Sequence, residues 1–229
     1  MDEILLKKYN RLLVEKNKVL NLTAHRDEAR SWVFNVQDSL LFNKTIKNSP
    51  FGKGGGCAAD GGFKLLDLGS GCGCPAIPLK IAYPELDVTM VDSVGKKVDF
   101  LNDVVGVLGL KNIRAVHSRI EDFSATARES YDIVTAKAVA ELRTLVEYAL
   151  PFLKVGGVLL AYKGKNSECE ITAAGSALRE LGGEVLEVKT AILRDGTEEH
   201  TRTLVIVKKV KPTPSKYPRG KNLPRVKPL

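Results

Sequence analysis

The chain has 229 residues, of which 44% are hydrophobic, and this is enough to bury a core in one domain with appendages. No apolar run approaches the ~18 residues of a membrane span, and the start of the chain lacks a signal-peptide pattern, so a cytoplasmic protein is expected. The four cysteines show no C-x-x-C spacing, so no metal site is expected. The formal net charge is +8 and is unevenly distributed along the chain.

The first 60 residues are predicted to form a helical cap followed by a glycine-rich linker. Apolar residues at helical spacing predict an amphipathic helix over residues 4–20. Asp27 is expected to begin a second helix, which continues to Leu41. Residues 48–62 are rich in glycine and are interpreted as the boundary between the cap and the main domain.

Residues 61–209 alternate between short apolar runs and amphipathic stretches, which predicts an α/β domain with a mostly parallel sheet. The predicted strands are 64–68, 87–91, 113–117, 131–136, 155–162, 184–192 and 201–208. The predicted helices are 75–83, 94–108, 140–150 and 167–181. Because no helix separates the last two strands, the final strand is expected to insert antiparallel to its neighbours.

A glycine-rich turn follows the first predicted strand. Glycines at 69, 71 and 73 carry no Cβ, so the backbone there is able to approach a bound ligand closely. Twenty-three residues after Gly69, a second apolar run ends in Asp92. An acid at the tip of the second strand of such a sheet is well placed to accept hydrogen bonds from ribose hydroxyls. Gly69, Gly71 and Asp92 therefore predict a nucleoside site; the alternative is a purely structural turn.

The spacing of the glycines indicates which nucleoside is bound. A dinucleotide site requires G-x-G-x-x-G with a helix N-terminus aimed at a pyrophosphate, whereas this loop is G-x-G-x-G. Asp67, just before the loop, would repel a pyrophosphate but suits the sulfonium and α-amino group of S-adenosylmethionine. S-adenosylmethionine is therefore the expected cofactor.

The excess positive charge is confined to the end of the chain. From residue 208 onward there are eight basic residues and no acidic one, which leaves 27 of the 35 basic residues to balance the 27 acidic ones. Five prolines fall in the same stretch, so the tail over 210–229 is expected to be extended rather than helical. A basic extended strap suits a phosphate backbone, and the alternative is a solubilising terminus.

Several motifs together resemble the bacterial ribosomal RNA small subunit methyltransferase G family, also called glucose-inhibited division protein B. They are Asn-Leu-Thr at 21–23, Asp-Ser-Leu at 38–40, the loop at 66–71 with Pro75 and Pro78, Asp92-Ser93 with the Lys pair at 96–97 and Phe-Leu at 100–101, Arg-Ile-Glu at 119–121, the run 131–138, Lys-Gly at 163–164, and Tyr-Pro-Arg at 217–219. The resemblance covers almost the whole chain.

This resemblance implies a Rossmann-like class I S-adenosylmethionine-dependent methyltransferase sheet with a small helical cap and a basic tail. It also implies an activity: methylation of N7 of a guanine in the 530 loop of 16S ribosomal RNA. The partner is then 16S RNA or the small ribosomal subunit, mature or assembling, with no membrane, and the protein is expected to be a monomer. The alternatives are a methyltransferase of the same fold acting on a small molecule or another RNA, and a non-catalytic RNA-binding protein with a vestigial pocket.

Some site residues carry over from the family motifs to matching positions of this sequence, and the others follow from the glycine loop and the charge pattern. The expected cofactor contacts are Asp67, Gly69, Gly71, Cys74, Asp92, Ser93, Val94, Ile120, Glu121 and Lys137. The expected RNA contacts are Lys97, Lys163, Lys216, Arg219 and Lys221. Lys137 stands where the family usually has Arg, which keeps the charge but loses the bidentate fork, and it is also the expected substrate orienter. Phe34-Asn35 replaces a common Arg-His pair.

The proposed target atom needs little chemical help. Guanine N7 bears a lone pair and no proton, so methyl transfer requires alignment rather than a general base, and no catalytic residue is assigned. The chain contains no Pro-Pro pair of the kind that cradles an exocyclic amine. It also contains no cysteine after the fourth strand placed to attack cytosine C5. These absences favour a ring nitrogen that is already nucleophilic.

Overall fold

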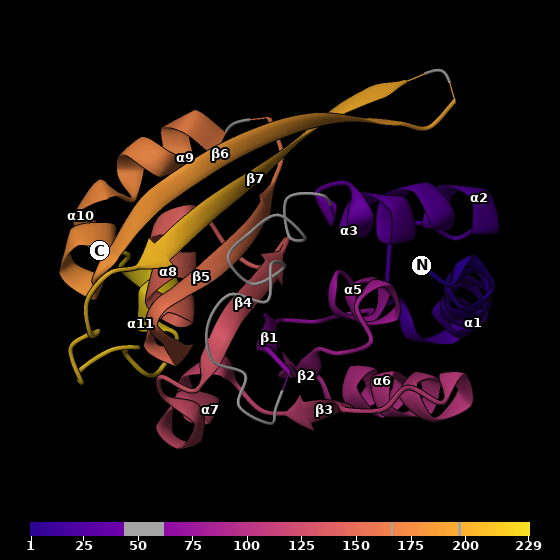
Figure 1. Ribbon diagram of the computed structural model, residues 1–229, viewed down its shortest axis with the longest axis horizontal. Helices are drawn as coiled ribbons and strands as arrows, with labels where there is room; N and C mark the ends of the chain where they lie inside the picture. Colours follow the sequence, from indigo (N-terminus) through magenta and orange to yellow (C-terminus); the bar gives the residue numbers. More distant parts are fainter. Residues whose placement is uncertain (44–61, 166, 197) are drawn as a thin grey trace.

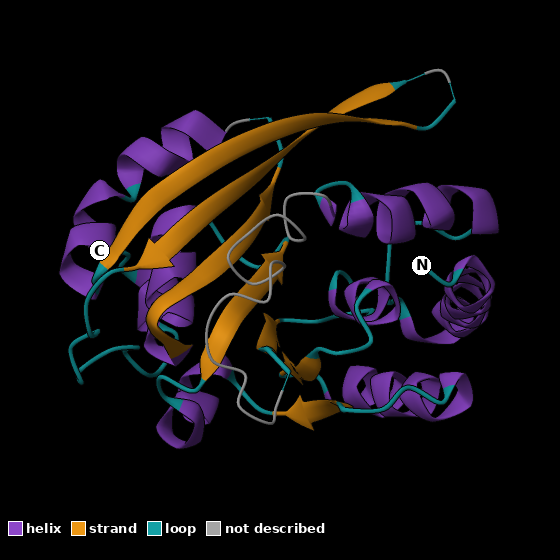
Figure 2. Cartoon of the chain, viewed as in Figure 1, coloured by secondary structure: helices purple, strands orange, loops and turns teal. Residues whose placement is uncertain are grey.

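The computed structural model describes residues 1–43, 62–165, 167–196 and 198–229, which form a seven-stranded sheet with helices on both faces (Figures 1 and 2). The strands are β1 Lys64–Leu68, β2 Asp87–Asp92, β3 Ile113–His117, β4 Tyr131–Lys137, β5 Leu153–Lys163, β6 Gly183–Arg194 and β7 Glu199–Lys209. Their order is β3-β2-β1-β4-β5-β7-β6. Only β7 runs antiparallel to its neighbours, β5 and β6, which confirms the predicted insertion of the last strand.

Two apolar clusters, one on each face, form the core. The helices of the first face are α1 Glu3–Leu20, α2 Glu28–Ser31, the π-helix η1 Trp32–Gln37, α3 Asp38–Leu40, α5 Ala76–Ala82 and α6 Gly95–Leu108. Those of the second face are α7 Ile120–Ala127, α8 Leu142–Ala149, the 3-10 turn η2 Leu150–Phe152, α9 Ser167–Ala173, α10 Gly175–Leu181 and the short α11 Leu223–Val226. Leu65 faces the first cluster and Leu66 the second, as the two-residue period of a strand requires.

The predicted strands are confirmed, with ends that differ by a few residues. The predicted helix over 167–181 is instead two helices, α9 and α10, separated by Ala174. The helix α7 was not predicted at all. Its signal was present, since Ile120, Phe123 and Ala127 recur at helical spacing and pack on the second cluster.

The N-terminal cap packs directly on the sheet domain, because residues of α1 share the first apolar cluster with β1 and α5. Asp27 caps the second helical stretch, and its side chain accepts a hydrogen bond from Arg30 N, as predicted. Within this stretch, η1 has π-helical turns, a geometry found often at functional sites. The predicted glycine-rich boundary at 48–62 lies, except for Gly62, outside the described residues.

The tail is not a free, fully extended strap. Its residues 223–226 form a helical turn, contrary to the prediction; Pro224 is tolerated there because it lies in the first turn, where its missing N–H has no helical partner. The Tyr217 side chain is buried, and its hydroxyl donates to Glu180. In the part of the chain that the structure describes, no helix is both long and apolar enough to span a bilayer.

Candidate functional site

Asp92 organises the loop that follows β1. Its carboxylate accepts hydrogen bonds from the backbone N–H groups of Gly71 (2.8 Å, to Oδ2) and Val94 (2.9 Å, to Oδ1). Only 7% of Asp92 is exposed. A carboxylate offers about four lone-pair positions, so each oxygen is able to accept one more hydrogen bond. Asp92 therefore ties the glycine loop to the tip of β2 and still presents acceptors to a ligand.

The three loop glycines have different roles, although all have positive φ angles. A Cβ on Gly69 would lie 3.0 Å from the Val139 side chain, and one on Gly71 would make only an ordinary contact, 3.8 Å from the carbonyl oxygen of Gly69. A Cβ on Gly73 would lie 2.6 Å from Ile77. Gly73 is therefore required for packing of α5, and the expectation that it makes room for a ligand is wrong.

A cavity of about 400 Å³ opens beside Gly69 and Asp92, and we call it the loop cavity. It is lined by Gly69, Val91, Asp92, Ser93, Val94, Lys97, Ser118, Arg119, Ile120, Glu121, Ala138, Val139, Tyr148, Asn222 and Arg225. Of the expected cofactor contacts, the structure brings Gly69, the segment 92–94 and the pair 120–121 together here. These residues come from the carboxyl ends of β1, β2 and β3, where ligands bind in open α/β sheets.

Asp67 and Cys74, both buried, line neither the loop cavity nor a second cavity next to the cap. Asp67 is 1% exposed; its Oδ1 accepts from the Thr135 hydroxyl at 2.7 Å, whereas Oδ2 has no partner among the described residues. Burial raises the pKa of Asp67 to about 7. The Cys74 thiol contacts the Tyr9 hydroxyl, at 3.1 Å.

Cys72 and Cys74 are both buried within the turn that follows β1. A hydrogen bond with Cys74, together with burial, raises the pKa of the Cys72 thiol well above its usual value. Tyr9 also donates to the carbonyl oxygen of Cys72, at 2.8 Å. Both cysteines are free and buried, as expected of reduced packing residues.

A second cavity, of about 530 Å³, lies between the cap and the ends of β4 and β5, and we call it the cap cavity. It is lined by His25, Phe34, Asn35, Asp38, Phe42, Ala136, Lys137, Ala138, Val139, Ala140, Glu141, Leu145, Tyr162, Lys163, Gly164, Glu170, Arg202 and Thr203. The two cavities share Ala138 and Val139. A molecule in one cavity is therefore separated from a molecule in the other only by this short stretch after β4.

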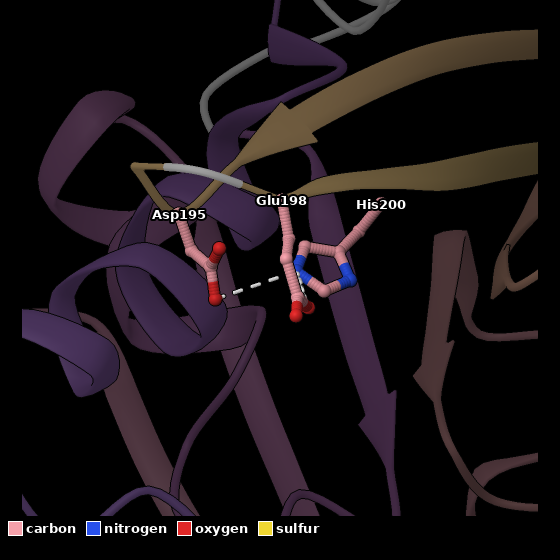
Figure 3. A group of neighbouring side chains, drawn as sticks. All are labelled: Asp195, Glu198 and His200. Carbon is pink, nitrogen blue, oxygen red and sulfur yellow. Dashed lines mark ion pairs between the residues drawn. The ribbon is translucent and has the colours of Figure 1, made fainter.

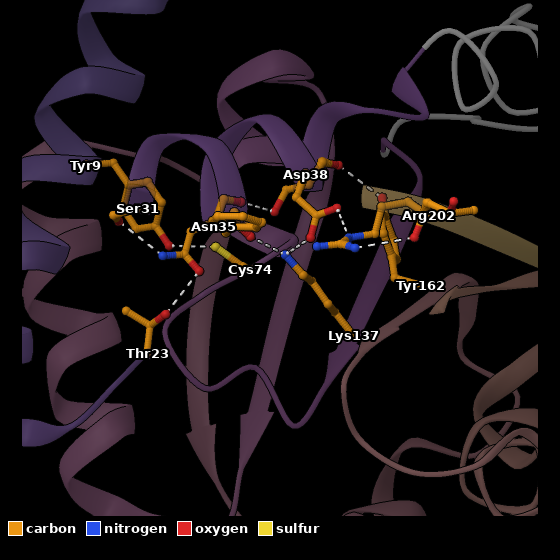
Figure 4. A network of polar contacts seen from close by, with 12 residues as sticks. Tyr9, Thr23, Ser31, Asn35, Asp38, Cys74, Lys137, Tyr162 and Arg202 are labelled. Carbon is orange, nitrogen blue, oxygen red and sulfur yellow. Dashed lines mark hydrogen bonds and ion pairs between the residues drawn. The ribbon is translucent and has the colours of Figure 1, made fainter. Parts of the chain in front are cut away.

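Asp38 is the centre of a charged network in the cap cavity (Figure 4). Its carboxylate accepts from Lys137 Nζ at 2.7 Å and from Arg202 Nε at 3.0 Å, and its side chain is 5% exposed. Lys137 also donates to the carbonyl oxygen of Phe34, at 2.7 Å. Lys137 thus faces the cap cavity and does not line the loop cavity, where it was expected to bind the cofactor.

Phe34, one of the departures from the family pattern, joins the cap to the sheet. Its ring stacks on His25 with centroids 4.4 Å apart, and the guanidinium carbons of Arg30 and Arg202 lie 5.6 and 5.9 Å from its centroid. Such cation–π contacts are favourable, and more so when partly buried. Asn35 donates to Ser31 Oγ at 3.0 Å. Both residues therefore have structural partners in this chain.

The tip of the β6–β7 hairpin reaches over the cap (Figure 1) and carries a group of polar side chains (Figure 3). Ligand-type atoms of Asp195, Glu198 and His200 lie within 4.8 Å of one another. His200 Nε2 is 3.4 Å from Asp195 Oδ2, and Arg30 lies 3.9 Å from the same oxygen. Because Arg30 already compensates the Asp195 charge, the geometry is that of an ion pair fastening the hairpin to the cap.

A family model described as rRNA small subunit methyltransferase G matches residues 2–201. The chain belongs to the rRNA small subunit methyltransferase G family. It is 44% identical to "Ribosomal RNA small subunit methyltransferase G" of Chloroflexus aggregans, over 95% of this chain and 86% of the relative. It is 42% identical to the protein of the same name from Lactobacillus delbrueckii subsp. bulgaricus, over 97% and 90%. The resemblance inferred from the motifs is confirmed.

Solved structures support the fold. The chain is similar to a mutant of the 16S rRNA (adenine(1408)-N(1))-methyltransferase from Catenulisporales acidiphilia, with a TM-score of 0.54 and 21% identity over 67% of this chain and 90% of that one. It is also similar to the YcgJ protein of Bacillus subtilis, with a TM-score of 0.54 and 15% identity over 76% and 98%. At these identities the likeness concerns the fold alone, and it confirms the predicted class I architecture.

The expected RNA contacts lie in different surroundings. Lys97 lines the loop cavity, and Lys163 lines the cap cavity, where it pairs with Glu170 at 2.6 Å. Lys216 and Lys221 are exposed on the tail. Arg219 instead binds the fully buried Glu147, so its guanidinium holds the tail to α8 and is not free for phosphate.

Sequence reasoning assigned no role to the residues that complete both cavities. Asp38 carried a signal, because it is a carboxylate on the apolar side of a predicted helix, next to Phe34 one turn earlier. Arg202 lies in the last strand, 164 residues after its partner Asp38, and nothing in the local pattern connects them. Nothing in the local pattern connects Asn222 and Arg225 of the tail with the loop cavity either.

Proposed function

We propose that this protein transfers a methyl group from S-adenosylmethionine to small-subunit ribosomal RNA, at N7 of a guanine in the 530 loop of 16S RNA. The observation that carries the proposal is the pair of cavities that meet at Ala138 and Val139. One suits a nucleoside cofactor and the other suits a polar planar acceptor. Family membership supports the RNA class, and the motif resemblance supports the guanine N7 target.

The loop cavity fits S-adenosylmethionine. The spare acceptor positions of Asp92 suit the two ribose hydroxyls, and Gly69 lets the backbone come close to the ligand. Ile120 and Glu121 line the part of the cavity beyond β3, where the adenine is expected. When bound, the cofactor supplies an electrophilic methyl group on its sulfonium.

The cap cavity fits a guanine. An ammonium group has three N–H donors, and Lys137 uses two of them, on Asp38 and on the Phe34 carbonyl oxygen. The third is left for an acceptor such as guanine O6, which neighbours N7. His25 offers an aromatic ring in the same cavity, braced from behind by Phe34. Stacking on such a ring is a common way of holding a single unpaired base.

The protein's contribution to the reaction is then alignment. N7 attacks with its own lone pair, so no residue has to remove a proton. Lys137, held by Asp38, orients the base, while Asp92 and the glycine loop hold the cofactor. Val139 lies between the two and contacts the position of Gly69. A fixed approach of this kind converts a bimolecular encounter into an effectively unimolecular step.

The test is methyl transfer by the purified protein. Labelled S-adenosylmethionine is incubated with unmodified 16S RNA and with 30S particles, and the modified nucleoside is identified after digestion. We expect label in 7-methylguanosine from the 530 loop. Asp92→Ala should abolish incorporation, whereas Asp87→Ala, an exposed acid at the other end of β2, should not. Label in a different nucleoside, or in a small-molecule acceptor but not in RNA, would refute the proposal.

A further inference from the structure

The end of the chain lies against the loop cavity. We define the C-terminal segment as residues 217–229; two of its residues, Asn222 and Arg225, line that cavity. Asn222 N donates to Glu121 Oε1 at 3.2 Å, and Arg225 Nη2 donates to the carbonyl oxygen of Val139 at 2.9 Å. The segment therefore touches the cavity both beyond β3 and at the stretch shared with the cap cavity.

The C-terminal segment is held firmly. Glu147 on α8 is fully buried and accepts from Arg219 through the backbone N–H at 2.9 Å, Nε at 2.8 Å and Nη2 at 2.6 Å. Thr144, also on α8, donates to the carbonyl oxygen of Pro224 at 3.0 Å. A bidentate Arg–carboxylate pair gives geometric specificity as well as energy. Arg225 is thus presented from a braced turn rather than from a loose tail.

Arg225 also has the chemistry of an anion-binding group. A guanidinium has five N–H donors, and in the described part of the chain Arg225 binds one main-chain oxygen, interacts with the Tyr148 hydroxyl and makes no ion pair with a carboxylate. Lys137, the cation expected to serve the cofactor, is committed to Asp38 in the other cavity. The loop cavity is also lined by Lys97 and Arg119, and Arg225 adds a guanidinium from the C-terminal segment, where the sequence carries no motif for it.

The position of Arg225 determines which part of the cofactor it would contact. If the ribose binds at Asp92 and the methyl group is directed at the shared wall, the methionine moiety would lie beside Gly69 and Val139, which line the same cavity. Arg225 is bound to Val139 itself. The only anionic group of S-adenosylmethionine is the α-carboxylate of this moiety. Guanidinium and carboxylate match in a two-point hydrogen-bonded geometry.

We propose that the C-terminal segment is a built-in wall of the cofactor site and that Arg225 is a positioning residue that binds the α-carboxylate of the cofactor. This inference rests on the proposed function, since its ligand is the methyl donor. It replaces the expectation that the tail acts chiefly as an RNA strap. The tail becomes part of the active domain, and its loss should weaken cofactor binding in the absence of any RNA.

The test compares three ligands by calorimetry without RNA: S-adenosylmethionine, S-adenosylhomocysteine and 5′-methylthioadenosine, which lacks the amino-acid portion. Arg225→Ala should weaken the first two about tenfold, as expected for one charged hydrogen-bonded contact, and leave the third unchanged. Arg225→Lys, which keeps the charge and guards against a folding defect, should lie between. Lys227→Ala removes an exposed charge of the same segment outside the cavity and should change nothing.

The possible results separate the two proposals. Equal weakening of all three ligands by Arg225→Ala would mean that the residue only braces the wall, and the carboxylate contact would be refuted. Unchanged affinities would also overturn it, while methyl transfer to RNA by the wild-type protein would leave the proposed function standing. If the wild-type protein binds none of the three ligands, the proposed function itself fails.

Discussion

The loop cavity and the cap cavity meet at the same two residues but are assembled in different ways. Most of the loop cavity comes from three short turns that follow β1, β2 and β3. The cap cavity is made from the N-terminal helices, the ends of β4 and β5, α9 and the last strand. Under the proposed function, the cofactor common to the fold class would be held mainly by local turns, whereas the specific acceptor would be held by distant parts of the chain.

Their electrostatics differ as well. In the loop cavity, the carboxylate of Asp92 is held by neutral backbone N–H groups and keeps acceptors for a ligand. In the cap cavity, the carboxylate of Asp38 is neutralised by Lys137 and Arg202. Removing the first acid should therefore damage mainly ligand binding, and removing the second should damage both folding and acceptor placement.

Asp38→Ala is expected to have the largest effect. It leaves Lys137 and Arg202 without their anion in a poorly solvated site, which should lower the free energy of unfolding by about 3 kcal/mol. Urea unfolding measures this loss, and Glu199→Ala, which breaks an exposed ion pair on the same strand as Arg202, should cost less than about 1 kcal/mol. Transfer to RNA should fall steeply while calorimetric affinity for S-adenosylmethionine stays within a factor of about two. An equally large loss of affinity for S-adenosylmethionine would contradict the idea that the two cavities bind different molecules.

Asp92→Ala tests the same comparison in the loop cavity. It removes the acceptor of two backbone N–H groups and, under the proposed function, of the ribose hydroxyls, so cofactor affinity should fall about 100-fold, equivalent to about 3 kcal/mol. Binding of the RNA alone, measured by filter retention, should be unchanged because Asp92 does not line the cap cavity. Equal losses in Asp92→Ala and the control Asp87→Ala would contradict this role.

A third prediction concerns the pH dependence of stability and the buried acid Asp67. Burial raises the pKa of Asp67 to about 7, from an ordinary value of 3.8 that also applies to the unfolded chain. Between these values the folded protein keeps a proton that the unfolded chain has released, so the contribution of Asp67 to stability falls as pH rises, by about 1 kcal/mol per pH unit. Below about pH 4 both states are protonated and the contribution is complete.

The measurement compares wild type with Asp67→Asn by urea unfolding at about pH 5, 6 and 7, within the window in which only the unfolded chain has released its proton. The difference in unfolding free energy should move steadily in favour of the variant as pH rises, because Asn cannot lose a proton. Parallel stability curves for the two proteins would show that Asp67 titrates normally. Asp67 belongs to the sequence motif of the loop but does not line the loop cavity. The experiment therefore also shows whether a residue of the motif contributes to stability rather than to ligand contact.

Prediction from sequence succeeded where the evidence was local. The existence and order of the strands, the start of a helix at Asp27 and the joint placement of Gly69, Asp92 and Glu121 follow from apolar periodicity and from the rule that parallel strands end at one edge. Prediction failed for basic residues, because the same charge is able to bind an RNA phosphate or a carboxylate of the protein itself. The charge of Arg219 looked like a phosphate contact but neutralises Glu147. Lys209, also counted in the basic end of the chain, is fully buried and donates to Glu129.

By itself, the sequence determined the succession of the seven strands, the glycine turn that follows the first of them and the family, because each depends on motifs of residues close together along the chain. The tertiary structure alone decided that Lys137 turns to Asp38, that Arg202 closes the cap cavity and that Arg225 enters the loop cavity. The physical reason is that a long charged side chain takes its partner from whatever the fold brings near, and burial makes that partner obligatory.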